Sequence, residues 1–241
     1  MGILSRIKNS GQKGIPTDFE EFHRSVYSKV KPYTMTSAER IFGLIEAIKY
    51  LSRNKIEGDI VECGVWKGGS MLATAITLVN EKDDARNLFM YDTYEGMSAP
   101  TDNDKTFFGE PASKMLKAAD PQKNPDNIWC YSSLEEVQGN MKLSGYKETL
   151  IHYVKGKVED TIPKTLPRNI ALLRLDTDWY ESTKHELVHL FPLLVKGGVL
   201  IIDDYGFWKG ARKAVDEYIS ENNVKILLNR MDDTGRIALK Q

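Results

Sequence analysis

Acidic residues end the apolar segments of this chain, and carboxylates in such places can bind cations or hydroxyl groups. The five acids concerned are Glu62, Asp92, Asp176, Asp203 and Asp204. If the apolar segments are neighbouring parallel strands, their carboxyl ends meet at the edge where open α/β sheets bind ligands. Five carboxylates at one edge repel one another, so we expect some of them to meet a cationic ligand, a metal ion or a hydroxyl-bearing group.

Three of these acids form an oxygen-rich set without a nearby histidine or cysteine cluster: Asp176, Asp203 and Asp204. Such a set suits Mg²⁺ or Mn²⁺, which would bind a substrate hydroxyl and lower its pKa. Asp178 lies two residues beyond Asp176 and can take the proton as a general base. The alternatives are that Asp178 caps the helix at Tyr180 and that Asp203 and Asp204 are only a helix cap or a pair of loop residues.

The segment from Asp59 to Ser70 reads Asp-Ile-Val-Glu-Cys-Gly-Val-Trp-Lys-Gly-Gly-Ser. It predicts a buried strand, a glycine turn, and a helix from about Gly69. Such a turn lets a ligand approach the backbone and presents free N–H groups. The spacing departs from the dinucleotide fingerprint Gly-x-Gly-x-x-Gly, and it is closer to the loop that holds S-adenosylmethionine (SAM) in class I methyltransferases. A tight turn with only a packing role is the alternative.

Asp92 strengthens the cofactor hypothesis, because it ends the next predicted strand after Glu62. An acid in that place can accept hydrogen bonds from the ribose hydroxyls of an adenosine cofactor. Both a dinucleotide and SAM satisfy that placement. Glu62 or the backbone around Gly64 can face the ammonium group of SAM, whereas the pyrophosphate of a dinucleotide would be repelled there. The pattern therefore favours SAM.

Composition excludes several other classes of protein. The chain has 241 residues, a net charge of −1 and two cysteines, which argues against nucleic acid as the main partner, a disulfide framework or a cysteine-rich zinc site. The sequence has neither the Gly-x-Ser-x-Gly elbow of a hydrolase nor the Walker loop of an NTPase, so both classes lack their central residues here. His185 is a weak base candidate because its helix follows the Asp176 loop. Without a long apolar run or a signal-peptide core, we expect a cytoplasmic protein and no membrane partner.

The elements that must position these residues alternate between strand and helix. Strands are predicted at 59–63, 87–92, 150–154, 169–176 and 199–204, and a hairpin at 225–231 and 236–240. Helices are predicted from about 19, 36, 69, 132 and 210, and one more is closed by Gly197-Gly198. This order predicts an α/β fold with a doubly wound, mostly parallel seven-stranded sheet and an antiparallel C-terminal hairpin.

We expect two parts in the chain. Residues 1–55 are predicted to form an N-terminal arm and helical cap, and residues 56–241 a single SAM-dependent methyltransferase domain. The stretch at about 93–128 has weak periodicity and many Gly, Pro, Asp and Lys residues. A poorly patterned insert of this length is usually functional, so a lid-like segment that shapes the acceptor pocket is predicted.

Five blocks of the sequence together resemble the macrocin O-methyltransferase family, over residues 33 to 220. These blocks are Met35–Arg40, Gly58–Ser70, Leu173–Thr183, Gly197–Gly206 and Arg212–Tyr218. The family contains SAM- and Mg²⁺-dependent sugar O-methyltransferases of the macrolide and aminocoumarin type, with a class I, Rossmann-like fold. Two features depart from the pattern: Trp179 stands where a smaller apolar residue is expected, and the insert after Gly96 has no clear family motif.

The resemblance implies roles for individual residues. Asp176, Asp203 and Asp204 would be the metal ligands, and Asp178 the candidate base. Glu159 would contact the adenine ring of SAM. The other implied SAM contacts are Met35, Thr36, Glu62, Gly64, Val65, Ser70, Asp92 and Thr93.

The favoured hypothesis is therefore a metal-dependent SAM O-methyltransferase that acts on a hydroxyl, most readily one on a sugar of a natural product or glycan. A rival hypothesis takes Asp176-Thr177-Asp178 as the Asp-x-Asp motif of a nucleotide-sugar glycosyltransferase, which leaves the glycine turn unexplained. A catalytically silent SAM-binding scaffold is the third hypothesis. The expected partners are a small-molecule or glycan acceptor and further copies of the chain, in a homodimer or higher homo-oligomer.

Overall fold

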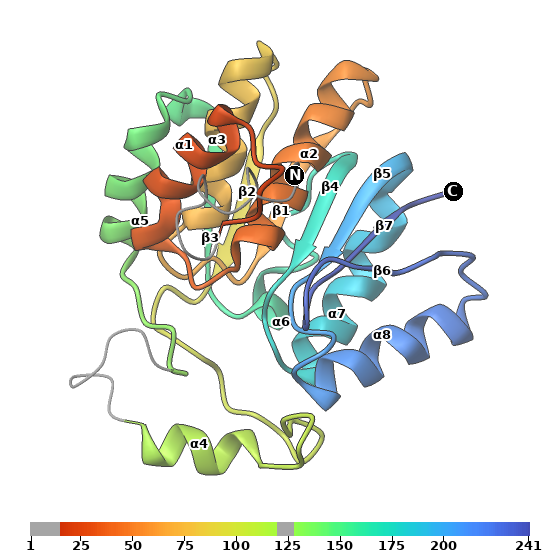
Figure 1. Ribbon diagram of the computed structural model, residues 1–241. Coiled ribbons are helices and arrows are strands. Elements are labelled where there is room, and N and C mark those ends of the chain that lie inside the picture. The colour runs from red at the N-terminus through yellow and green to blue at the C-terminus, as the bar shows by residue number, and fades with distance from the viewer. Residues whose placement is uncertain (1–14, 120–127) are drawn as a thin grey trace, which may run out of the picture.

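The computed structural model describes residues 15–119 and 128–241, which build a seven-stranded sheet with helices on both faces (Figure 1). The strand order is β3-β2-β1-β4-β5-β7-β6. The first five strands are parallel, and β7 is antiparallel to both of its neighbours. The order reverses between β1 and β4, which is the switch point where such sheets bind ligands. The predicted doubly wound sheet with an antiparallel C-terminal hairpin is confirmed.

The strands are β1 (Asp59–Cys63), β2 (Leu88–Asp92), β3 (Ile151–Lys155), β4 (Ile170–Leu175), β5 (Leu194–Ile202), β6 (Asn229–Arg230) and β7 (Arg236–Leu239). The α-helices are α1 (Glu21–Val30), α2 (Ala38–Arg53), α3 (Gly69–Glu81), α4 (Ala112–Ala118), α5 (Leu134–Met141), α6 (Val158–Thr161), α7 (Tyr180–Leu190) and α8 (Lys209–Glu221).

Side chains of the central strands alternate between two apolar layers, as the pleat of a strand requires. Ile60 and Met90 belong to the layer that holds residues of α1, α2, α3 and α5. Val61 and Tyr91 belong to the opposite layer, with residues of α6, α7 and α8. Because both faces are covered, the central strands are mostly apolar, and a charged residue inside one of them must find a partner within the protein.

The N-terminal helices share the main core rather than forming a separate unit. Val26 and Val30 of α1 lie in the same buried cluster as Ile60 of β1. Helix α2 begins after Ser37, close to the predicted start at about residue 36, and the Ser37 hydroxyl caps it by accepting a hydrogen bond from the Arg40 N–H at 3.1 Å. Residues 1–14 of the expected arm lie outside the described residues.

Two predicted elements were wrong in their bounds, and the insert contains a helix that was not predicted. Gly197 and Gly198 do not close helix α7, which ends at Leu190 before a 3₁₀ turn that contains Pro192. They lie inside β5, where the Gly197 N–H bonds the Lys240 carbonyl at 2.7 Å and extends the pairing with the last strand. Strand β6 covers two residues instead of 225–231. The insert contains a helix, α4, that its weak periodicity did not predict.

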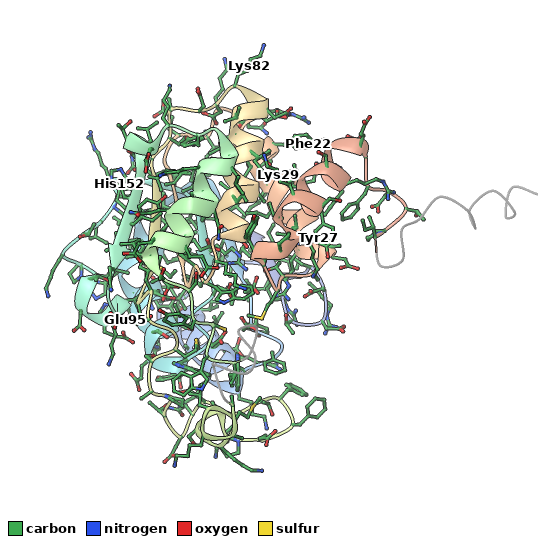
Figure 2. The ribbon with its side chains drawn as sticks, turned by 90° about the vertical axis from the view of Figure 1, so that its left-hand side faces the viewer. Phe22, Tyr27, Lys29, Lys82, Glu95 and His152 are labelled. Carbon is green, nitrogen blue, oxygen red and sulfur yellow. The ribbon has the colours of Figure 1, made fainter. Side chains whose placement is uncertain are left out.

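The insert lies at one end of the molecule, and α4 stands apart from the other helices (Figure 1). Figure 2, which labels Glu95 near the start of the insert, shows the same end from the side. Backbone hydrogen bonds tie the insert to the segment after β5, from Phe107 N to Phe207 O and from Lys209 N to Lys105 O, both at 2.8 Å. Residues 120–127 of the insert lie outside the described residues. Among the described ones, no helix has the length and apolarity to cross a membrane.

Candidate active site

A cavity of about 450 Å³ is lined by residues at the carboxyl ends of β1, β2, β4 and β5. Its volume lies in the range of small-molecule sites, and its place is the switch point of the sheet. The glycine loop after β1, the carboxylate loops after β4 and β5, the insert and the Tyr33–Thr36 segment all contribute to the lining. The sequence placed the ligand at this edge, and the cavity is there.

Three carboxylates from two loops converge in this cavity. One oxygen from each of Asp176, Asp178 and Asp204 lies within 4.8 Å of the others. Burial raises the pKa of Asp178 from its ordinary 3.8 to about 7, although a hydrogen bond with Asp204 acts in the opposite direction. Burial also raises the pKa of both Asp176 and Asp204. Hard oxygen ligands whose charges repel one another fit a divalent cation such as Mg²⁺.

Asp203 lies beside this cluster but faces two arginines. Its Oδ1 accepts a hydrogen bond from Arg174 Nη2 at 2.5 Å, and its Oδ2 accepts one from Arg40 Nη1. Adjacent residues at a strand end point in different directions, so Asp203 and Asp204 meet different partners. Asp178 takes the place in the cluster that the sequence-based set gave to Asp203. The role of Asp203 as a metal ligand stays a prediction.

Arg174 and Arg40 are site residues to which the sequence analysis gave no role. Arg174 is the next-to-last residue of β4 and is 3% exposed, and it also pairs with Glu62 and with Asp176, the latter at 2.7 Å. A guanidinium inside an apolar strand needs buried acids around it. The run Ile-Ala-Leu-Leu-Arg-Leu-Asp carried that signal, because one charge interrupts a segment that is otherwise apolar.

Glu62 is placed differently from the expectation that it faces the ammonium of SAM. It is 1% exposed and is not among the residues that line the cavity. Its Oε1 accepts a hydrogen bond from Arg174, and its Oε2 has no partner among the described residues. Burial raises its pKa to about 7, with Arg174 acting in the opposite direction. Glu62 therefore balances the charge of Arg174, and its contact with a cofactor stays a prediction.

Asp92 and Gly64 shape the loop after β1. Asp92 lines the cavity, and its carboxylate accepts hydrogen bonds from the N–H groups of Val65 at 2.6 Å, Trp66 at 3.1 Å and Tyr94 at 2.7 Å. Gly64 has a φ of +82°, and an added Cβ would lie 2.1 Å from the Asp176 carbonyl oxygen. The glycine thus lets β1 and β4 approach closely, so the packing role considered for this turn is real.

The other predicted cofactor residues line the cavity as a group: Met35, Thr36, Gly64, Val65, Ser70, Thr93 and Glu159. The Tyr33–Thr36 segment packs closely on the start of α3 at Gly69. A Cβ on this glycine would lie 2.4 Å from the Tyr33 carbonyl oxygen. His185 does not line the cavity, and its Nε2 lies 2.9 Å from the Ile162 carbonyl oxygen. Phe207 and Trp208, which the sequence analysis did not single out, form part of the wall.

Replacing Asp178 by Asn is expected to stabilise the metal-free protein at pH 8 by about 1 to 2 kcal/mol. An acid whose pKa is higher in the folded chain holds its proton more tightly there, so stability falls as the pH rises from about 4 to about 7. Asparagine does not titrate, so the variant lacks this pH-dependent loss of stability. Thermal unfolding of both proteins at pH 5 and pH 8, with chelator present, measures the effect. An equal gain at both pH values would contradict the electrostatic explanation.

Comparisons with known proteins give the family and the relatives of this chain. A family model described as Macrocin-O-methyltransferase (TylF) matches residues 8–238. The chain is 30% identical over 203 residues to 8-demethyl-8-(2,3-dimethoxy-alpha-L-rhamnosyl)-tetracenomycin-C 4'-O-methyltransferase of Streptomyces olivaceus, covering 84% of this chain and 74% of the relative. It is 29% identical over 204 residues to demethyldecarbamoylnovobiocin O-methyltransferase of Streptomyces niveus, covering 84% and 74%.

Solved structures give the same fold. The O-methyltransferase NovP superposes with a TM-score of 0.75 at 26% sequence identity, over 87% of this chain and 82% of that one. CalS11, a calicheamicin methyltransferase, superposes with a TM-score of 0.61 at 16% identity, over 95% and 97%. The second likeness shows the fold alone. The glycosyltransferase hypothesis has no support in these comparisons, and the relatives are named as enzymes rather than scaffolds.

Proposed function

This chain belongs to the macrocin O-methyltransferase family and is a SAM-dependent O-methyltransferase, and we propose that it methylates a sugar hydroxyl with the help of a divalent cation. The observation that carries the proposal is the convergence of Asp176, Asp178 and Asp204 in the cavity beside the glycine loop. Such a cluster supports a cation site and a proton acceptor beside the space that we assign to the methyl donor.

The lining of the cavity supports a division into two ends. We assign the donor to the end formed by the Gly64–Ser70 loop, Asp92 and Glu159, where backbone N–H groups and carboxylates suit an amino acid joined to an adenosine. SAM, when bound, supplies an electrophilic methyl group. The residues around it would position it against the acceptor oxygen and exclude water, which are the main contributions an enzyme makes to such a displacement.

The carboxylates prepare the acceptor oxygen. We assign a divalent cation to Asp176 and Asp204, and the role of proton acceptor to Asp178. A bound Mg²⁺ would supply a Lewis acid that lowers the pKa of a hydroxyl. A group with a pKa of about 7 can accept a proton near neutral pH. The pairing of Arg174 with Asp176 lowers the pKa of that ligand, against the larger effect of burial.

A sugar acceptor is supported by the names of the relatives, two of which are called a mycinamicin III 3''-O-methyltransferase and a rhamnosyl-tetracenomycin 4'-O-methyltransferase. The remaining wall of the cavity contains Met97, Met115, Ile128, Phe207 and Trp208. Apolar and aromatic side chains pack against the C–H faces of sugar rings and against apolar aglycones.

A homodimer or higher homo-oligomer, proposed from the sequence, is tested by light scattering.

A methyl-transfer screen tests the function. Enzyme, isotope-labelled SAM and Mg²⁺ are mixed with a panel of glycosides and with the same aglycones lacking the sugar. We expect label in the glycosides alone, at a sugar oxygen. Calorimetric titration should show binding of SAM and none of a nucleotide-sugar. Label on an aglycone would overturn the sugar assignment, and the lack of SAM binding would overturn the cofactor assignment.

Substitution can tell which acid, Asp178 or Asp203, acts on the cation that we assign to Asp176 and Asp204. Asp178→Asn and Asp203→Asn remove one charge each at neighbouring positions, so they are matched variants. If the cation site follows the cluster seen here, Asp178→Asn should weaken Mn²⁺ binding by about tenfold or more, and Asp203→Asn by less. Electron paramagnetic resonance of added Mn²⁺ measures both. The reverse order would restore the sequence-based set of Asp176, Asp203 and Asp204.

A further inference from the structure

The geometry points to Asp104, a residue of the insert, as a positioning residue for the carboxylate loop Asp176–Trp179. This inference rests on the proposed role of Asp178. Asp104 is fully buried and lies far from the loop in sequence. We propose that Asp104 and Trp179 clamp the insert to this loop. The clamp keeps the wall of the acceptor cavity and the proposed base, Asp178, in a fixed position relative to each other.

Asp104 provides a cap that helix α7 lacks in its own sequence. The residue before the helix is Trp179, whose side chain makes no cap hydrogen bond, because an indole has no acceptor for an N–H group. The Asp104 Oδ1 accepts a hydrogen bond from the Tyr180 N–H at 2.8 Å. A carboxylate at a helix N-terminus also interacts favourably with the helix dipole. The first turn of α7 therefore depends on a residue of the insert.

The position of Asp104 is fixed from its other sides. Its Oδ2 accepts hydrogen bonds from Thr101, from the N–H at 2.6 Å and from the hydroxyl at 2.9 Å. A Cβ on Gly210, near the start of α8, would lie 2.1 Å from the Asp104 Oδ1. The glycine is needed there because the carboxylate occupies the space between the first turns of two helices. Because Asp104 is fixed in this way, it can fix the position of the Tyr180 N–H from which it accepts a hydrogen bond.

Trp179, the departure from the family pattern, makes the second half of the clamp. It is 2% exposed, and its Nε1 donates a hydrogen bond to the Ser98 carbonyl at 3.1 Å. Its ring meets that of Trp208 edge-on at a centroid distance of 5.0 Å, in a small apolar cluster that includes Ala112 and Leu116 of α4. A smaller side chain would not reach both the insert and the segment after β5.

The backbone of Asp178 explains why a clamp is needed. Asp178 has a φ of +68°, in the left-handed region that is unfavourable for a residue with a side chain. Such a conformation persists only where the surroundings hold it. The clamp acts on the two residues that follow, Trp179 and Tyr180. Loss of the Asp104 contact would let the loop relax and move the Asp178 carboxylate away from Asp204.

Asp104→Ala and Asp104→Asn test the clamp, with Glu110→Ala as the control, because Glu110 is an exposed acid of the same segment. Four properties are measured: kcat, the KM for SAM, Mn²⁺ affinity, and amide hydrogen exchange in residues 176–182. We expect Asp104→Ala to lower kcat by about 10- to 100-fold, to weaken Mn²⁺ binding and to speed exchange, with the KM for SAM within about twofold. Asp104→Asn keeps an oxygen for the Tyr180 N–H and should lie between Asp104→Ala and the wild type.

The outcomes separate the clamp from its premise. Should Asp104→Ala unfold, Asp104→Asn alone decides by the same four measurements. Wild-type kcat, Mn²⁺ affinity and exchange in a variant that is merely less stable would overturn the clamp. If the wild type binds no Mn²⁺, or if Asp178→Asn keeps full kcat, the proposed site fails instead. The exchange rate of residues 176–182 then supports or overturns the clamp without reference to catalysis.

Discussion

Asp204→Asn is expected to lower kcat for methyl transfer by about 100- to 1,000-fold while leaving SAM affinity within about threefold of the wild type. Asp204 belongs both to the carboxylate set predicted from the sequence and to the cluster in the structure. Asparagine keeps the shape of the side chain but removes its charge. The cation then loses a charged ligand, and the acceptor hydroxyl is activated less. Steady-state kinetics with the acceptor identified by the screen, together with calorimetric titration of SAM, measures both quantities.

Asp233→Asn is the control for this variant, because Asp233 is a fully exposed acid in the C-terminal hairpin turn. We expect wild-type kinetics from it. If Asp204→Asn turns over as fast as the control at saturating SAM and Mg²⁺, the carboxylate cluster has no part in the chemistry. A loss confined to SAM binding would place Asp204 at the donor end of the cavity instead.

Arg174→Met is expected to destabilise the protein by about 3 to 5 kcal/mol. Methionine fills much of the same volume, but Glu62, Asp176 and Asp203 lose their shared cation in a buried place. Asp203 keeps Arg40 as a partner, but Glu62 and Asp176 must take up protons or stay charged without one, and their pKa values, which burial already raises, should rise further. The loss of stability should therefore be larger at pH 8 than at pH 5. Urea unfolding at the two pH values measures it.

Arg53→Met provides the matched control, since Arg53 forms an ion pair with Glu81 on the surface and is 62% exposed. Exposed pairs contribute about 0 to 1 kcal/mol, so this variant should unfold close to the wild type. Equal stability of Arg174→Met and Arg53→Met would mean that the buried network does not hold β1, β4 and β5 together at the site. Arg174→Lys should rescue only in part, because an ammonium cannot form the same forked hydrogen bonds.

The sequence predicted the sheet because its signals are local. The apolar runs and the acids at strand ends depend on neighbouring residues, and the parallel order follows from alternation of strands and helices. The glycine loop and the strand-end acids also led to the correct edge of the sheet. For this reason the cavity could be placed from sequence, and most of the predicted cofactor residues line it.

The contacts inside the site could not be predicted in the same way, because they depend on packing between distant segments. Asp203 and Asp204 are neighbours in sequence, yet one meets two arginines and the other meets Asp178. Asp104 lies in a segment without periodicity, and nothing nearby in sequence shows that it caps α7. Gly197 and Gly198 have the composition of a helix end, but pairing with the last strand places them within β5.

Metal dependence of methyl transfer is the most direct test of the proposed function. The purified enzyme is stripped with chelator, and product formation from SAM and a glycoside acceptor is followed as Mg²⁺ is added back. We predict no detectable turnover without the cation and full recovery at saturating Mg²⁺, with SAM bound in both states. Undiminished turnover in excess chelator would contradict the role assigned to Asp176, Asp178 and Asp204.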